Sequence, residues 1–464
     1  MLSRSFVSAL PLRSCTQQEN LLTNNQLKII KKAVLISGLL FYCNTGTTYR
    51  KKKYFCMINT NTMKLHKLFA AICSIAMLTS ISATTVEAKK KDQKAKYIFL
   101  FIGDGMGYNH VAATESYLSY KEGKLGGAML TMSQFPYYGV ATTFSANDYV
   151  TDSSAAGTAI ASGEKTNNYA LGVDPEGKPV KSMAYDLQED GYNIGIVTTV
   201  AVNHATPGAF YASSASREDY YDISKQILKS EFEFFAGSGF LDFKGKKGEE
   251  APIDAYLEDN GYEVSYGLKE FKKEAAGKDR VILCQESNKA ENAGNYISSG
   301  AIAEDATLAE MLSCGIEHLG DKKPFFIMCE GGDIDWGGHG NKIMPVVTNV
   351  LSFDEAIKVA YEFYKKHPKE TLIVVTADHE TGGLSLGAGP KINWQILEES
   401  WAEGKQQNNL GWRENTELNR KASIGWTTGS HTGAPVPVFA IGKGAEKFSG
   451  RMDNTDIKGK ILGE

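Results

Sequence analysis

Three short segments of the chain combine aspartate and histidine in a way that is typical of metal sites. Asp335 and His339 lie four residues apart in Asp-Ile-Asp-Trp-Gly-Gly-His-Gly, which we expect to be a loop. Asp378 and His379 are adjacent, and His431 stands in Gly-Ser-His-Thr-Gly. Carboxylate and imidazole donors around one ion, with a position left for water or substrate, are the composition of a catalytic zinc site. Each segment alone could equally be a polar turn, so the interpretation depends on all three meeting in the fold.

Three oxygen donors would suit a harder ion. Asp104 lies in Gly-Asp-Gly-Met-Gly directly after an apolar run, Glu330 ends another apolar run, and Thr206 carries a hydroxyl close behind His204. Such oxygens are the ligands that magnesium prefers, and the glycines beside Asp104 would let a second ion approach the same carboxylate. The alternatives are a turn aspartate and a solvated loop glutamate.

Ser153 is the candidate nucleophile. It follows Thr151 and Asp152 and starts a run of small residues that Gly163 can end, which predicts a helix beginning near the serine. The unpaired N–H groups at such an N-terminus attract a phosphate. The motif is short, and an ordinary serine-rich helix cap is the alternative.

The candidate residues follow apolar runs that predict buried strands, with helical patterns between them. Alternating strands and helices predict an α/β fold, a largely parallel central sheet sandwiched by helices. Ligands of such folds bind beyond the carboxyl ends of the strands, where the candidate residues stand. Strands are expected at 97–102, 194–200, 325–329, 372–376 and 438–441, and helices at 182–189, 304–319 and 349–366.

Two stretches fit this alternation less well. Residues 240–295 are polar and irregular, and residues 387–428 carry four tryptophans among polar residues. We interpret both as inserts within a single domain that spans 89–464. Because the second insert immediately precedes Gly429 to Gly433, we expect it to overhang the site.

The first part of the chain resembles an export signal. Within 63–88, Lys64 and Lys67 precede an apolar stretch at 68–78, and Val-Glu-Ala forms a small-x-small cleavage site. The apolar stretch is shorter than the roughly 20 residues that a membrane-spanning helix needs. We interpret residues 1–62 as an extension assigned to the protein in error, with translation starting at Met63. A genuine N-terminal anchor is the alternative. The protein is therefore expected to be exported, and to be periplasmic or extracellular.

The charge of the remaining chain restricts its partners. Residues 89–464 hold 39 lysines and arginines against 52 aspartates and glutamates. Such an acidic body argues against binding to nucleic acid or to an anionic membrane, and no stable membrane span is expected. A phosphate-binding site must therefore supply its own positive charge, which metal ions could do. Cys284, Cys314 and Cys329 allow at most one disulfide.

Seven blocks of this sequence stand in a fixed order: Gly103-Asp104-Gly105-Met106-Gly107, Thr151-Asp152-Ser153-Ser154-Ala155-Ala156, Asn203-His204-Ala205-Thr206-Pro207, Arg217, Glu330 to His339, Thr376-Ala377-Asp378-His379 and His431-Thr432-Gly433. Together these blocks resemble alkaline phosphatase. They follow the order of that family, and the resemblance covers the chain from about residue 97 to about residue 441. It implies a phosphomonoesterase that forms a phosphoserine intermediate, and it suggests a homodimer.

The resemblance also implies a role for each candidate residue. Two zinc ions about 4 Å apart can clamp the attacking and leaving oxygens of an in-line displacement, and the planar fork of Arg217 suits two phosphate oxygens. One zinc would be held by Asp335, His339 and His431, the second by Asp104, Asp378, His379 and Ser153, and one magnesium by Asp104, Thr206 and Glu330.

Two positions depart from the enteric bacterial members of the family. His204 stands where those proteins carry aspartate, so we hypothesise weaker magnesium binding and an activity that responds to added magnesium. Trp336 stands where they carry lysine, which removes one positive contact near phosphate. Both are possible neighbours of the ligands rather than ligands.

Other functions remain open at this stage. The related phosphodiesterases and nucleotide pyrophosphatases share the two-metal cluster, although Arg217 and a serine nucleophile favour monoesters, which have one more free oxygen to bind. The Cys-x-Pro-x-Arg and Ser-x-Pro-x-Arg motifs of sulfatases do not stand at the nucleophile. A phosphate- or metal-binding protein without turnover is the remaining alternative.

Overall fold

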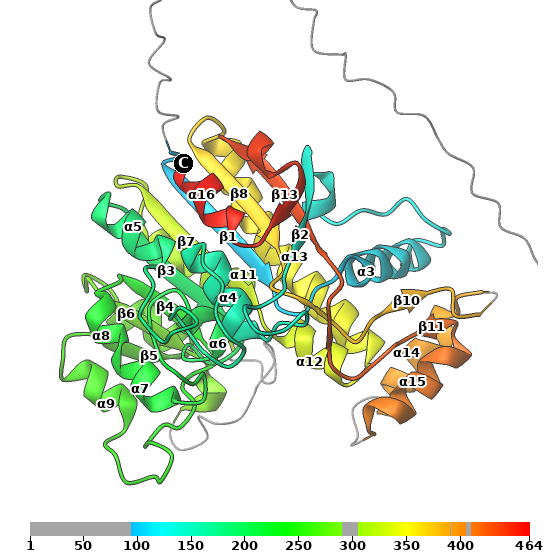
Figure 1. Ribbon diagram of the computed structural model, residues 1–464, viewed down its shortest axis with the longest axis horizontal. Coiled ribbons are helices and arrows are strands. Elements are labelled where there is room, and N and C mark those ends of the chain that lie inside the picture. The colour runs from blue at the N-terminus through cyan, green and yellow to red at the C-terminus, as the bar shows by residue number, and fades with distance from the viewer. Residues whose placement is uncertain (1–93, 290–304, 390, 405–409) are drawn as a thin grey trace, which may run out of the picture. The chain divides into compact units, whose positions relative to one another are not determined.

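A largely parallel sheet runs through the described part of the chain. The computed structural model describes residues 94–289, 305–389, 391–404 and 410–464, and these form a ten-stranded sheet (Figure 1). Only β13 is antiparallel to its neighbours. In sheet order the strands are β14 (Gly450–Asp453), β2 (Tyr137–Thr142), β13 (Val436–Gly442), β8 (Thr371–Thr376), β1 (Tyr97–Gly103), β7 (Phe325–Gly331), β3 (Asn193–Thr198), β4 (Phe234–Gly237), β6 (Val281–Cys284) and β5 (Glu263–Tyr266).

The central strands are apolar along their whole length because helices cover both faces of the sheet. Every residue of β1 is buried, and β1 pairs in parallel with β7 and β8. A strand buried on both faces has no solvent side to fill with polar residues, which explains the continuous run Tyr-Ile-Phe-Leu-Phe-Ile. The expected α/β fold with a largely parallel sheet is confirmed.

Two groups of helices cover the sheet. The first group consists of α11 and α13, which contact β1, β3, β7 and β8, and of α3, which packs on α13. The second group lies in front of the strands in Figure 1 and contains α4, α5, α6 and α16. A capping box between Thr307 and Glu310 starts α11. The helices are α3 (Tyr108–Lys121), α4 (Ser153–Ser162), α5 (Met183–Glu189), α6 (Ala205–Gly208), α7 (Tyr220–Lys225), α8 (Ile227–Ser230), α11 (Leu308–Leu319), α12 (Asp333–His339), α13 (Ile343–Lys366) and α16 (Asp456–Leu462).

Three details differ from the sequence expectations. The stretch 240–289 is not irregular: it forms α9 (Ile253–Glu258), β5, α10 (Gly267–Glu274) and β6, and its two strands complete one edge of the sheet. The strand expected at 438–441 exists as β13 but runs antiparallel. Asp335 and His339 lie one turn apart on the short helix α12, not in a loop.

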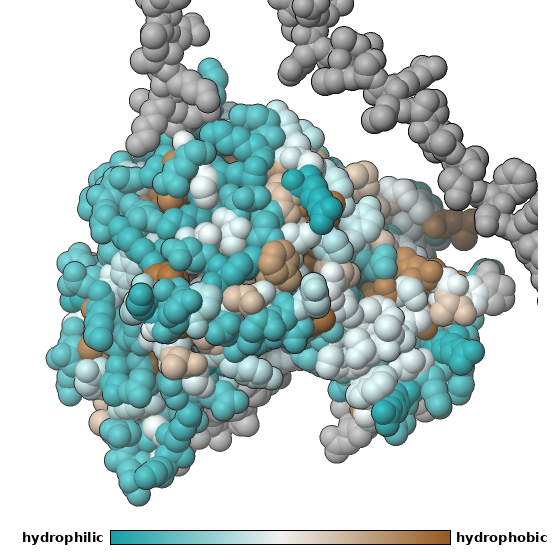
Figure 2. Space-filling model, viewed as in Figure 1, coloured by the Kyte–Doolittle hydropathy of each residue, from teal (hydrophilic) through white to brown (hydrophobic). Residues whose placement is uncertain are grey.

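The tryptophan-rich stretch near the C-terminus forms a separate small unit beside the sheet. It contains α14 (Trp394–Ala402) and α15 (Trp412–Lys421), and β11 (Ile424–Gly425) pairs with β10 (Ser385–Leu386). The proposed extension at 1–62 and signal at 63–88 lie outside the described residues, as do 290–304 and 405–409. Among the described residues, no helix is both long and apolar enough to span a bilayer, and Cys284, Cys314 and Cys329 are buried free thiols. The face in Figure 2 is mostly hydrophilic.

Candidate metal and phosphate site

The carboxyl ends of the central strands bring the predicted site residues together. Asp104 directly follows β1, Glu330 lies near the end of β7, and Asp378 and His379 follow β8. His431 lies on the short strand β12 (His431–Thr432), which pairs with β9 (Glu380–Thr381) next to His379. Parallel strands end at one edge of a sheet, so residues far apart in sequence meet there.

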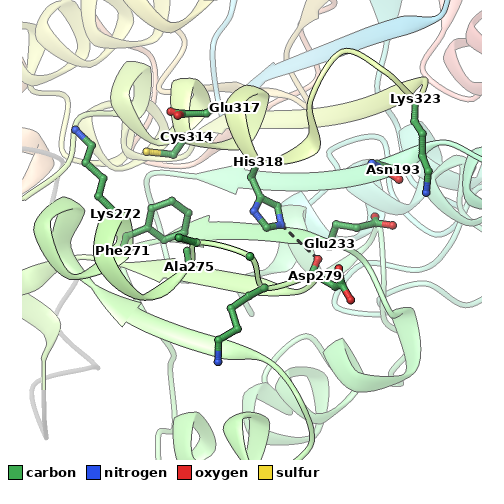
Figure 3. A pocket seen from close by; sticks show the side chains of 13 residues that line it. Asn193, Glu233, Phe271, Lys272, Ala275, Asp279, Cys314, Glu317, His318 and Lys323 are labelled. Atoms are coloured by element: carbon green, nitrogen blue, oxygen red, sulfur yellow. Dashed lines mark hydrogen bonds between the residues drawn. The ribbon is translucent and has the colours of Figure 1, made fainter.

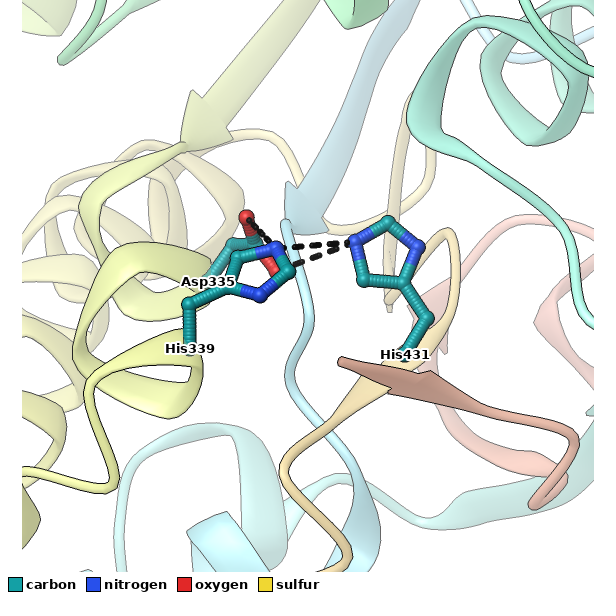
Figure 4. A group of neighbouring side chains, drawn as sticks. All are labelled: Asp335, His339 and His431. Carbon is teal, nitrogen blue, oxygen red and sulfur yellow. Dashed lines mark hydrogen bonds and ion pairs between the residues drawn. The ribbon is translucent and has the colours of Figure 1, made fainter. Parts of the chain in front are cut away.

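Asp335, His339 and His431 form the first ligand group, with their ligand atoms within 4.8 Å of one another (Figure 4). The Nε2 atom of His339 lies 3.3 Å from Oδ2 of Asp335, and Nε2 of His431 lies 3.5 Å from Oδ1. The Nδ1 atoms of the two rings lie 2.8 Å from backbone oxygens, those of Gly429 and Thr151. These second contacts fix both rings with Nε2 pointing at the aspartate.

The second group surrounds the Nε2 atom of His379. This nitrogen lies 3.2 Å from Oγ of Ser153, 3.3 Å from Oδ1 of Asp104 and 3.3 Å from Oδ2 of Asp378. Asp335, Asp104 and His379 also qualify together as a ligand group, so Asp335 connects the first group to the second. The hydroxyl of Ser153 thus stands at the edge of a continuous cluster of ligand atoms.

The third group contains Asp104, His204 and Glu330, and it shares Asp104 with the second. The hydroxyl of Thr206 lies 3.4 Å from Oδ2 of Asp104. His204 was predicted only as a neighbour of the ligands. In the structure one of its ring nitrogens lies within 4.8 Å of an oxygen of each carboxylate, close enough for the three to bind one ion.

Two threonines that the sequence analysis missed hold the ligands in place. The hydroxyl of Thr381 donates to Oδ1 of Asp335 at 2.5 Å and lies 3.2 Å from Nδ1 of His379. The hydroxyl of Thr198, at the end of β3, donates to Glu330. Two features of the sequence could have pointed to these residues: Thr198 lies at a strand end, and Thr381 ends the motif Asp-His-Glu-Thr. Threonine is common at both kinds of position, so neither feature is specific.

The cluster concentrates negative charge that burial alone cannot stabilise. Burial, together with the neighbouring carboxylates, raises the pKa of Asp104 well above its usual value, and burial does the same to the pKa of Asp378. Burial raises the pKa of Glu330 to about 7. One oxygen of each of these three side chains is buried without a hydrogen-bond donor from the described residues. Cations would supply the missing positive partners, so the donor set fits bound metal ions.

The imidazoles are already suited to binding cations. Burial lowers the pKa of His379 well below its usual value, and burial lowers the pKa of His204 to about 3. His339 differs, because its contact with Asp335 outweighs burial and raises its pKa to about 9. The same contact and the nearby imidazoles outweigh burial at Asp335 and lower its pKa. Metal ligation requires neutral rings and ionised carboxylates, so His339 and the carboxylates with raised pKa must release protons when a cation binds.

Ser153 is the first residue of α4, as predicted. The Asp152 side chain caps this helix: it accepts the N–H of Ala155 at 3.0 Å and the hydroxyl of Ser154 at 2.7 Å. The Ser153 hydroxyl therefore sits beside the positive end of the helix, a favourable place for a phosphate.

Arg217 lies between the cap of α4 and the third ligand group. Its Nη1 donates to Oδ2 of Asp152 at 3.0 Å, and its Nη2 lies 3.4 Å from Nε2 of His204. The ring of Trp336 meets the ring of His204 edge to face, with centroids 6.3 Å apart. Together with Ser153 these residues line an open cavity of about 400 Å³.

A second cavity, of about 750 Å³, lies at the amino ends of the strands, the end of the sheet opposite to Ser153 (Figure 3). Asn193, Glu233 and Lys323 line it at the amino ends of β3, β4 and β7, with His318 from α11. No residue that lines it belongs to a metal-ligand group within the described ranges. Although it is larger, it has no donor set comparable with that around Ser153.

The tryptophan-rich unit supports the loops beside the first ligand group. Asn415 of α15 donates to the carbonyl of Gly340 at 2.8 Å, directly after His339. Trp412 packs against Gly429, where a Cβ atom would approach the indole to 2.6 Å. The insert that we expected to overhang the site thus contacts Gly340, next to His339, and Gly429, two residues before His431.

A model of the family described as alkaline phosphatase matches residues 95–233 and 290–462. The chain belongs to the alkaline phosphatase family. Alkaline phosphatase 4 of Bacillus subtilis is 31% identical over 459 residues, which cover 83% of this chain and 94% of that protein. The alkaline phosphatase from the Antarctic bacterium TAB5 superposes with a TM-score of 0.66 at 30% identity, covering 80% of this chain and 98% of its own.

The family and the enzyme class predicted from the sequence are therefore confirmed: this alkaline phosphatase family member is a phosphoric monoester hydrolase. A TAB5 variant in which aspartate replaces a histidine has been solved with Mg bound in its M3 site; it has a TM-score of 0.65 and 29% identity, covering 80% of this chain and 97% of its own. The segment 234–289, with β4, β5 and β6, falls outside the family match.

Proposed function

We propose that the protein is an exported phosphomonoesterase, in which the Ser153 oxygen attacks phosphorus, the P–O bond to the ester breaks so that the alcohol leaves, and Ser153 is phosphorylated. The observation that supports this most is the position of the Ser153 hydroxyl, 3.2 Å from Nε2 of His379 and at the start of α4. The helix N-terminus and the Arg217 guanidinium bind the phosphoryl oxygens and orient phosphorus toward Ser153. Water then hydrolyses the phosphoserine, and two inversions give net retention at phosphorus.

The residues proposed to hold metal fall into three sets. Bound there, metal ions would supply Lewis-acid stabilisation of the attacking and leaving oxygens. In the structure, His204 groups with Asp104 and Glu330 of the third set. One zinc is assigned to Asp335, His339 and His431, the second to Asp104, Asp378, His379 and Ser153, and magnesium to Asp104, Thr206 and Glu330.

Two measurements test the nucleophile and the substrate class. Ser153→Ala should lose hydrolysis of p-nitrophenyl phosphate while still binding inorganic phosphate by calorimetry, with Ser162→Ala, at the far end of the same helix, as the matched control. Hydrolysis that persists in Ser153→Ala would contradict the assignment. Faster turnover of bis-p-nitrophenyl phosphate than of the monoester would indicate a phosphodiesterase.

We also propose export, to the periplasm or to the medium, and a homodimer. Tyr108 and Tyr138, whose ring centroids lie 6.1 Å apart, are both about half exposed on one surface, which supports a protein contact there. Light scattering should give twice the chain mass. A monomeric mass at micromolar concentration would contradict the dimer, and activity confined to the cytoplasm would contradict export.

A further inference from the structure

The cavity at Ser153 changes character between its floor and its mouth. Ser153 and His204 are buried, whereas Tyr169, which lines the same cavity, is 64% exposed. A phosphate held by Ser153 and Arg217 occupies the buried end. The organic group of a phosphomonoester must then extend toward the exposed end, where Tyr169 lies.

The backbone at Tyr169 is held in an unfavourable conformation. Its φ angle is +69°, in the left-handed region that an aromatic residue rarely adopts. The carbonyl oxygen of Tyr169 accepts the backbone N–H of Arg217 at 2.8 Å, and Leu171 and Ser214 exchange two backbone hydrogen bonds at 2.8 and 3.0 Å. Such conformations persist where the surroundings enforce them, and they are concentrated at functional sites.

The residue before Tyr169 ties the same segment to the nucleophile. The Oδ1 atom of Asn168 accepts the N–H of Asp152 at 3.1 Å, and its Nδ2 donates to the carbonyl of Val150 at 3.0 Å. The segment is thus fixed on one side to the loop that carries Ser153 and on the other to Arg217. The backbone of Tyr169 is therefore held at the mouth of the cavity, which keeps the point from which its side chain extends fixed.

We infer that Tyr169 determines substrate specificity: its ring forms a wall on which the organic group of the substrate packs, so that the site favours aryl phosphomonoesters over alkyl ones. This inference depends on the proposed phosphomonoesterase activity. An exposed ring offers a face that a planar group can cover, and such contacts are favourable beyond the area they bury. Trp336 and Val150 also line the cavity and add apolar surface.

The test compares phenyl phosphate with ethyl phosphate in three variants. Tyr169→Asn removes the ring and tolerates positive φ, Tyr169→Phe keeps the ring, and Tyr149→Ala alters a tyrosine that is 90% exposed and does not line the cavity. In Tyr169→Asn, kcat/KM for phenyl phosphate should fall about 3- to 10-fold, with less than a twofold change for ethyl phosphate. Tyr169→Phe and Tyr149→Ala should resemble the unmodified enzyme.

Inorganic phosphate provides a second readout, because it has no organic group. Its competitive inhibition constant should be unchanged in Tyr169→Asn. An equal loss for both esters, or weaker inhibition by phosphate, would overturn the inference, since it would show that Tyr169 acts by positioning Arg217. If the unmodified enzyme hydrolysed neither ester, the proposed activity itself would be wrong.

Discussion

The Nε2 atoms of His339 and His431 lie 3.1 Å apart (Figure 4). The Nδ1 atom of each ring faces a backbone carbonyl oxygen. A carbonyl oxygen only accepts, so each Nδ1 carries a hydrogen and, in a neutral ring, each Nε2 presents a lone pair. Two lone pairs at this distance repel unless a proton or a metal cation lies between them. The backbone thus prepares both rings to share one positive ion with Asp335.

Removal of metal is therefore expected to inactivate and destabilise the enzyme. A chelator would leave Asp104, Asp378 and Glu330 without their positive partners, and the loss of tightly bound ions should lower Tm by on the order of 10 °C. Thermal scans and phosphatase assays on protein shown by mass spectrometry to be metal-free would measure this. Recovery with zinc plus magnesium is the control, and full activity in the metal-free protein would contradict the expectation.

Metal affinity should rise with pH. Burial raises the pKa of Asp104 and Asp378 well above their usual values and that of Glu330 to about 7, and the contact with Asp335 outweighs burial to raise the pKa of His339 to about 9. These groups hold protons in the metal-free protein that a bound cation must displace. Affinity should therefore increase up to about pH 9, roughly tenfold per pH unit for each proton released.

Competition with a colorimetric zinc chelator at pH 6, 7 and 8 would measure this dependence. Calorimetry in buffers of different ionisation enthalpy would count the protons directly. Asp378→Asn removes one titrating group of the second zinc set and should reduce the slope. An affinity that is constant or falls with pH would show that the carboxylates are ionised before metal binds.

The site could be predicted largely because its residues follow apolar strands. Asp104, Asp378 and His379 each follow a run that reads as a buried strand, and parallel strands place their ends together whatever the loops between them do. The direction of β13 could not be predicted in this way. An apolar run has the same composition in either orientation, and only pairing with β8 and β2 shows that it is antiparallel.

The remaining misses have physical causes. Strands β5 and β6 were overlooked because they are four residues long and lie within a polar stretch. The ligand spacing of Asp335 and His339 fits a helix as well as a loop, and the two glycines of α12 concealed the helix. Thr381 could not be identified, because its role comes from a contact with Asp335, far away in the sequence.

Replacing Arg217 by lysine should weaken phosphate binding and slow turnover. The guanidinium is held by Asp152 at 3.0 Å, and an ammonium cannot keep that contact while also presenting two parallel donors to phosphate. The loss of one charge-assisted hydrogen bond predicts a fall in kcat/KM of about 10- to 100-fold. Arg280→Lys, at the partly exposed pair with Glu231, is the control. An unchanged kcat/KM for p-nitrophenyl phosphate together with unchanged inhibition by phosphate would exclude Arg217 from phosphate binding.

His204→Asp should strengthen magnesium binding at the cost of phosphate affinity. The new carboxylate would join Asp104 and Glu330 in the third ligand group, where the imidazole now lies. It would also stand close to Nη2 of Arg217, which is 3.4 Å from Nε2 of His204, and would draw the guanidinium away from phosphate. Magnesium titration of zinc-loaded protein should give a lower Kd, and phosphate should inhibit more weakly. Unaltered magnesium affinity would place the third ion elsewhere.

Helix α15 should contribute to metal retention although it carries no ligand. Asn415 is fully buried and donates to Gly340, the residue after His339, while Asn419 donates to the carbonyl of Asn341, whose φ angle is +49°. Asn415→Ala leaves the Gly340 carbonyl without this donor, which should cost about 1–3 kcal/mol of unfolding free energy. It should also free the chain that carries His339.

The expected results are a lower urea midpoint and faster transfer of zinc to a chelator. Glu417→Ala, at an exposed position on the same helix, should change stability by less than about 0.5 kcal/mol. Both readouts are needed, because destabilisation without faster zinc loss would mean that α15 only packs against the body. Faster zinc loss at an unchanged urea midpoint would instead assign α15 entirely to holding His339, since the loop would then move without the fold weakening.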